Sequence, residues 1–187
     1  MRAIRSTLLA LIGLSLASAA SLAASDRPYA GMEQRPIKAL SDQDIGELRA
    51  GRGMGLALPA ELNGLPGPRH VLDLADRLGL SAAQRAVMQR MFDEMREVAV
   101  ALGERVLDRE AALDRLFAAP AHDEADMRSL VTEIAALRGD LRFTHLRYHL
   151  RTSEALTQEQ IALYRRERGY DDTAPASPGH HPRQHPQ

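Results

Sequence analysis

Two histidines one helical turn apart are the residues whose spacing most directly suggests chemistry. His145 and His149 stand at positions i and i+4, which on a helix places both imidazoles on one face, close enough to bind one metal ion. Two ligands are too few, so His70, His122, a methionine or an acidic residue would have to complete such a site. The alternative is a pair of partly buried histidines hydrogen-bonded within a helix interface. Both hypotheses are open from the sequence.

Methionines and arginines form the second group of candidate residues. Three methionines recur at helical spacing, and such a row either fills a core or gives a surface that adapts to many partners. Four arginines lie in pairs on the two flanks of the apolar stripe of a later helix. An apolar strip bordered by arginines suits an unfolded polypeptide, and it is equally typical of a buried face beside solvated charge. The candidate client-binding residues are Met88, Met91, Met95, Leu102, Arg138, Arg142, Arg147 and Arg151.

The composition excludes several functional classes. The 187 residues contain no cysteine, so disulfides, thiolate nucleophiles and cysteine-ligated metals are absent. The chain has 24 Lys and Arg residues and 25 Asp and Glu residues, so it has no overall positive charge to attract nucleic acid. No glutamate follows His145, and no serine sits in a nucleophile elbow. We therefore expect no enzymatic activity and no required cofactor, with a divalent metal (Zn, Ni, Co or Cu) as the one open possibility.

Residues 1–24 are expected to be a cleaved Sec-type signal peptide. Arg2 and Arg5 precede an uncharged run from Thr7 to Ala17, and small residues follow it at the spacing a signal peptidase accepts. As a helix the run would reach only about 16 Å, roughly half the hydrocarbon core of a bilayer. We expect a periplasmic protein without stable membrane insertion.

The rest of the chain divides by composition into three parts. Residues 25–67 are expected to be an arm with one short helix from Ser41 to about Ala50, preceded by a loosely ordered segment and followed by a Gly/Pro-rich connector. The run Gly51-x-Gly53-x-Gly55 lacks the context of a phosphate-binding loop, which favours a plain connector. Residues 68–170 are predicted to be a helical domain. Residues 171–187 are expected to be a disordered His/Pro tail, whose histidines could collect metal weakly.

The helical domain is predicted to be a long antiparallel hairpin with short flanking helices, so the fold class is all-α. The predicted helices run from Pro68 to Leu78, from Ala82 to about Ala118, from Asp123 to near Ser153, and from Thr157 to about Arg168. The short connection at 119–122 forces the two long helices to run antiparallel. The apolar faces of two such long helices are larger than one short helix can bury. We therefore predict either a partner subunit that covers the remaining apolar surface or an exposed groove.

Two similar motifs introduce two of these helices. Leu80-Ser81-Ala82-Ala83-Gln84 and Leu156-Thr157-Gln158-Glu159-Gln160 each have capping-box spacing. Together they resemble the paired Leu-Thr-x-x-Gln motifs of the Spy/CpxP family of periplasmic proteins, and the resemblance extends over residues 68–170.

This resemblance implies a small all-α protein that forms a cradle-shaped homodimer. It implies an ATP-independent chaperone, or an envelope-stress protein whose partners are unfolded envelope proteins or a sensor protein. The family also includes relatives that sense heavy metals, which makes a metal sensor or resistance protein using His145 and His149 the alternative function.

Overall fold

A computed structural model describes residues 27–170, and within that range the structure is helical and has no strand. The predicted signal peptide and the predicted tail lie outside the described residues. None of the helices in the described range is long and apolar enough to span a membrane. The chain divides into two units after Gln34. In the first, turns lead into the 3-10 helix η1 (Met32–Gln34), and the Glu33 carboxylate accepts a hydrogen bond from the Gly31 amide at 2.7 Å.

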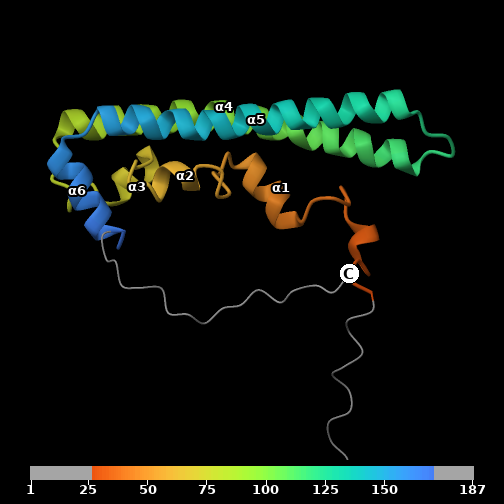
Figure 1. The fold of residues 1–187 in the computed structure, drawn as a ribbon, viewed down its shortest axis with the longest axis horizontal. Coiled ribbons are helices and arrows are strands. Elements are labelled where there is room, and N and C mark those ends of the chain that lie inside the picture. The colour runs from red at the N-terminus through yellow and green to blue at the C-terminus, as the bar shows by residue number, and fades with distance from the viewer. Residues whose placement is uncertain (1–26, 171–187) are drawn as a thin grey trace, which may run out of the picture. The chain divides into compact units, whose positions relative to one another are not determined.

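The second unit is built on an antiparallel hairpin of α4 (Ala82–Ala118) and α5 (Glu124–Glu154), as Figure 1 shows. Helix α4 begins at the predicted capping box, in which the Ser81 side chain accepts from the Gln84 amide and the Gln84 side chain accepts from the Ser81 amide. Asp123 caps α5 by accepting from the Ala125 amide at 2.7 Å. The predicted all-α fold with a long helical hairpin is confirmed.

Three short helices lie along one side of the hairpin (Figure 1): α1 (Asp42–Arg49), α2 (Leu58–Glu61) and α3 (Pro68–Asp73). We call residues 35–79 the strap. Helix α3 ends at Asp73, earlier than predicted, and the chain continues in turns to Gly79, whose φ of +61° places it in the left-handed region. Helix α6 (Gln158–Glu167) lies at the end of the hairpin away from the α4–α5 turn.

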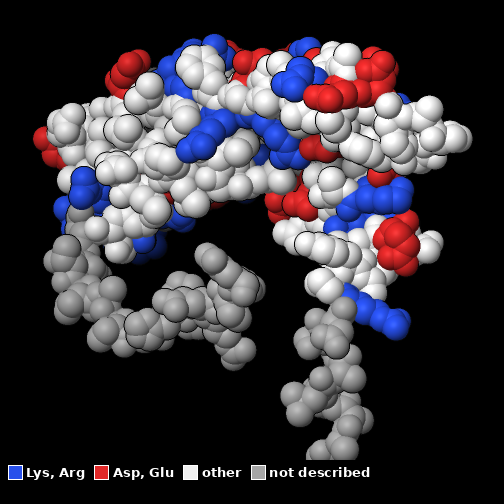
Figure 2. Space-filling model, turned by 45° about the vertical axis from the view of Figure 1, so that its right-hand side comes forward, with Lys and Arg blue, Asp and Glu red and all other residues white. Residues whose placement is uncertain are grey.

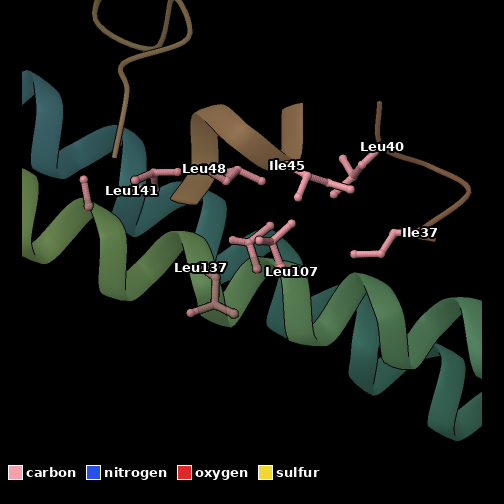
Figure 3. Packing of buried hydrophobic residues seen from close by; sticks show 9 residues of the cluster. Ile37, Leu40, Ile45, Leu48, Leu107, Leu137 and Leu141 are labelled. Atoms are coloured by element: carbon pink, nitrogen blue, oxygen red, sulfur yellow. The ribbon is translucent and has the colours of Figure 1, made fainter. Parts of the chain in front are cut away.

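The first core cluster lies between the strap and the middle of the hairpin (Figure 3). The segment before α1 was expected to be loosely ordered, but its Ile37 and Leu40 are buried there and anchor it. Helix α1 approaches α4 closely because Gly103 has no side chain: a Cβ at Gly103 would lie 2.4 Å from the Leu48 carbonyl oxygen. The cluster consists of Ile37, Leu40, Ile45, Leu48, Ala99, Val106, Leu107, Leu137 and Leu141.

The second core cluster joins α3, the start of α4 and α6. Gln84 and Gln160, one from each predicted motif, meet beside it and hydrogen-bond to each other through their side-chain amides. The two motifs therefore hold the start of α6 against the start of α4. The cluster consists of Val71, Ala75, Leu78, Leu80, Met88, Leu156 and Tyr164.

The far end of the hairpin has no such cover. Between residues 111 and 133, which we call the hairpin tip, no residue is buried. This segment is nevertheless rich in apolar side chains, and Phe117 and Val131 are exposed to 55% and 50%. The other large apolar side chains of the hairpin tip are half-buried: Leu113, Leu116, Met127 and Leu130.

Candidate functional site: a pocket between the strap and the hairpin

A pocket of about 740 Å³ lies between the glycine-rich part of the strap and the two long helices. The strap contributes residues 50–58, Glu61 and residues 67–70 to its wall. Helix α4 contributes Phe92, Met95 and Arg96, and α5 contributes His145 and His149. Its volume is within the range of sites that bind small molecules.

Both predicted histidines lie in this wall, and both are buried. Gly67 of the strap makes room for the His149 ring, and Gly53 lies beside the His145 ring at ordinary contact distance. A Cβ at Gly67 would lie 2.7 Å from His149 Nε2, and a Cβ at Gly53 would lie 3.7 Å from His145 Nδ1. The glycine-rich segment, interpreted from sequence as a plain connector, therefore seats the rings of α5 against the backbone of the strap.

The hydrogen bonds of the two rings differ. The Nδ1 of His149 donates to the Leu65 carbonyl oxygen at 2.7 Å, which fixes the neutral tautomer and leaves Nε2 without a proton. The Nε2 of His145 is buried and has no hydrogen-bond partner among the described residues. Burial lowers the pKa of both rings, and for His145 the neighbouring His149 lowers it further. Both rings are therefore neutral at pH 7.

A buried carboxylate adjoins the histidines where α2, α3 and α6 meet. The hydroxyls of Tyr164 and Tyr170 both donate to Oε1 of Glu61, the second at 2.8 Å, and the Arg168 guanidinium lies 3.3 Å from the same oxygen. Burial alone would raise the pKa of Glu61, but the neighbouring His70 and the hydrogen bonds from Tyr164 and Tyr170 outweigh it and lower this pKa to about 2.

The other oxygen of Glu61 faces the histidines: Oε2 lies 3.3 Å from His70 Nδ1 and 3.8 Å from His149 Nδ1. Glu61 is not among the site residues predicted from the sequence. Its one available signal is that it is the only acidic residue between Glu47 and Asp73, within an otherwise apolar and glycine-rich segment.

No complete set of metal ligands is in place among the described residues. In the described part of the chain, no group of three or more histidine and acidic side chains is arranged to hold a metal ion. His122, considered as a third ligand, lies at the hairpin turn and hydrogen-bonds to the Leu116 carbonyl at 3.0 Å. The histidines of the predicted tail lie outside the described residues.

The predicted apolar client-binding residues lie at different depths. Met88 is fully buried in the second core cluster, and Met95 is buried in the pocket wall. Met91 and Leu102 are half-buried. Met88 has no exposed surface, so in the free protein it serves packing and cannot contact a client unless the core opens. Met95 is 6% exposed, at the pocket wall.

The predicted arginines lie on α5 but serve different contacts. Arg138 forms an ion pair with Glu110 of α4 at 2.7 Å, and Arg142 is exposed. The guanidinium groups of Arg147 and Arg151 lie over the Tyr148 ring, 5.4 Å and 4.9 Å from its centroid. Cation–π contacts of this kind hold both side chains against the hairpin.

A second apolar feature on α5 is not among the features predicted from the sequence. Phe143, Leu146 and Leu150 stand at i, i+3 and i+7, and Phe143 and Leu150 are exposed to 60% and 55%. We call these three residues the outer stripe. The stripe predicted for this helix consists of residues on its buried face. The outer stripe has the same helical period, so the spacing alone does not distinguish the buried face from the exposed one.

Comparison with protein-family models, with curated proteins and with solved structures finds no match. The resemblance to the Spy/CpxP family therefore rests on the two short motifs and on the order of the helices.

Proposed function

We propose that this protein is a periplasmic, ATP-independent chaperone-like protein of the Spy/CpxP type, which shields exposed apolar segments of envelope proteins. The observation that carries this proposal is the hairpin tip, where apolar side chains recur on both helices and none is buried. A monomer that leaves such side chains in water gains stability when another polypeptide covers them.

The outer stripe extends the available apolar surface along α5. Arg147 lies over the Phe143 ring, 5.8 Å from its centroid, so a charged group borders the stripe. Over the face shown in Figure 2, basic and acidic side chains are interspersed. A surface of separate apolar patches among both signs of charge suits clients of varied sequence better than one strongly charged ligand.

The proposal includes a homodimer, because a second copy is the simplest cover for apolar side chains that one hairpin leaves exposed. The supporting observation is again the tip: the buried residues nearest to it are Glu110 on α4 and Ile134 on α5, and the strap reaches the tip through the Lys38–Asp114 ion pair at 2.9 Å. Sedimentation of the purified protein tests this part, and a monomer at micromolar concentration would contradict it.

Suppression of aggregation tests the main proposal. The double variant Phe117→Ser, Val131→Ser removes the two most exposed large apolar side chains of the tip, and we expect it to keep the fold, since neither side chain is buried. We expect the unmodified protein to suppress aggregation of a chemically denatured client at equimolar dimer, and the double variant to need several-fold more protein. Leu62→Ser is the matched control, since Leu62 is 61% exposed but lies in the strap. Equal activity of all three proteins would overturn the proposal.

A heavy-metal sensor is the second candidate. One observation favours it: His145 and His149 share their pocket with His70 and Glu61, residues of types that bind metals. It has less support because no three ligands converge. Calorimetric titration with Zn²⁺, Ni²⁺, Co²⁺ and Cu²⁺ tests it: micromolar binding lost in the His145→Ala, His149→Ala variant would support it. Binding that is absent, or unchanged in that variant, would contradict it.

A further inference from the structure

The pocket carries an excess of positive charge that the rest of the structure leaves unneutralised. Arg52 and Arg96 line it and form no ion pair with any described residue. Arg69, the third arginine of the wall, pairs with Asp73 at 3.0 Å. The only acidic side chain in the wall is Glu61, whose Oε1 pairs with Arg168 at 3.3 Å and whose Oε2 lies 3.3 Å from His70 Nδ1, so one carboxylate faces three arginines of the wall. The pocket therefore favours an anion over a cation.

The remaining wall is apolar. Met54, Leu58, Phe92 and Met95 line the pocket together with small residues of the strap. Met54 has a φ of +46°, a left-handed conformation that a residue with a side chain rarely adopts. This conformation is held by the flanking strap, in which the Leu56 amide donates to the Gly53 carbonyl at 2.7 Å.

Three polar atoms of the pocket wall lack a hydrogen-bond partner among the described residues: Glu61 Oε2, His70 Nδ1, which lies 3.3 Å from that oxygen, and His145 Nε2. His145 is 4% exposed and lines the pocket, and its Nε2 makes no hydrogen bond to any described residue. A buried nitrogen without a partner costs free energy unless a ligand or a water satisfies it. Because the neutral imidazole has one donor and one acceptor nitrogen, it can hydrogen-bond to an oxygen of a bound molecule.

We propose that this pocket binds a small amphipathic organic anion, a molecule with one carboxylate or phosphate group on an apolar body. Arg52 and Arg96 would bind the anionic group, since guanidinium groups match the planar oxygens of carboxylates and phosphates. Phe92, Met95 and Leu58 would contact the apolar body. This site is separate from the hairpin tip and the outer stripe, so it is independent of the proposed chaperone function.

Calorimetric titration with octanoate, octyl phosphate and octylammonium tests the proposal. All three carry the same apolar chain, and only the charged group differs. We expect saturable 1:1 binding per chain of octanoate, octyl phosphate or both, which identifies the anionic group, and at least about tenfold weaker binding of octylammonium. Equal binding of octylammonium would overturn the proposal, because the site would then be merely apolar. Absence of binding by both anions would overturn it as well.

Variants locate the site. Arg52→Gln with Arg96→Gln should weaken anion binding about tenfold or more, since charge-assisted hydrogen bonds are lost. Arg90→Gln with Arg115→Gln is the matched control, because both arginines are exposed on α4 and line no pocket. An equal loss in both double variants would show non-specific charge attraction and overturn the proposal. Circular dichroism verifies that each variant keeps its helices.

The imidazole of His145 gives a second measurement that needs no substitution. Nitrogen-15 NMR of the histidine rings should show a shift at His145 on saturation with the anion that binds. His122, which lies outside the pocket, should not respond. Binding that leaves the His145 resonances unchanged would place the ligand elsewhere and overturn the proposal.

Discussion

Gln84 and Gln160 stand 76 residues apart and exchange hydrogen bonds through their side-chain amides, at 2.9 Å in one direction and 3.2 Å in the other. Each also completes the cap of its own helix: Gln84 Oε1 accepts from the Ser81 amide at 3.1 Å, and Gln160 Oε1 accepts from the Thr157 amide at 3.0 Å. The two similar motifs are therefore similar for a physical reason. Each glutamine serves one local cap and one joint between two helices.

Replacing either glutamine should test this joint. Gln84→Ala loses a cap and a half-buried amide pair, and we expect a loss of about 1–3 kcal/mol in the free energy of unfolding. Gln160→Ala should cost a similar amount, and urea unfolding measures both. Gln89→Ala is the control on the same helix, because Gln89 bonds only to exposed Asp93.

The double variant Gln84→Ala, Gln160→Ala should cost at least about 0.5 kcal/mol less than the sum of the single variants. The reason is that the first substitution already removes the shared pair of hydrogen bonds. Strictly additive losses would show that the two motifs act as separate caps.

Two helical glycines should respond to alanine with opposite signs. At Gly103 a Cβ would lie 2.4 Å from the Leu48 carbonyl, so Gly103→Ala must displace α1 and should destabilise the protein by roughly 1–3 kcal/mol. At Gly139 a Cβ would meet nothing within 4 Å, and Gly139→Ala should stabilise α5 by about 0.5–1 kcal/mol. Thermal unfolding measures both. A Gly103→Ala protein as stable as the original would contradict the close packing of α1 on α4.

The buried histidines should make stability fall in mild acid. Burial lowers the pKa of His145 below its ordinary value of 6.5, so the unfolded chain binds the proton more readily than the folded one. The free energy of unfolding should therefore decrease as pH falls below about 6.5, and His145→Gln should reduce this decrease. The comparison is urea unfolding at pH 7.5, 6.5 and 5.5, with His122→Gln as the control at an exposed site. An identical pH dependence in the two variants would contradict the prediction.

Tyr164 should contribute stability through Glu61. Tyr164→Phe leaves the buried carboxylate with one donor fewer, so we expect a loss of about 1–3 kcal/mol at pH 7. It should also raise the pKa of Glu61 from about 2. Because the pKa of Glu61 is lower in the folded protein than the ordinary value of 4.5, its ionised carboxylate stabilises the fold above pH 4.5. This stabilisation is lost as the pH falls toward 2. Acid unfolding of the variant should therefore begin at a higher pH than that of the unmodified protein. Tyr29→Phe, at a 76% exposed ring, is the control.

Local signals in the sequence identified most of the helices, because caps and helix breakers act within a few residues of the element they bound. The capping boxes at Ser41, Ser81 and Thr157 are present as predicted, and α4 has the predicted bounds. The i, i+4 spacing also placed His145 and His149 on one face. Local signals of this kind do not show which residues of the strap lie against α5.

Tertiary packing determines which residues come together at the pocket. Glu61 becomes a buried partner of Tyr164 and Tyr170 only because the strap folds back over the end of the hairpin, bringing together residues more than a hundred positions apart. Gly67 acquires its role only because the His149 ring of α5 packs against it. The sequence by itself determined the two long helices and the amount of apolar stripe. Only the three-dimensional fold decided which part of that stripe the strap covers and which it leaves to water, because burial depends on contacts that no single segment contains.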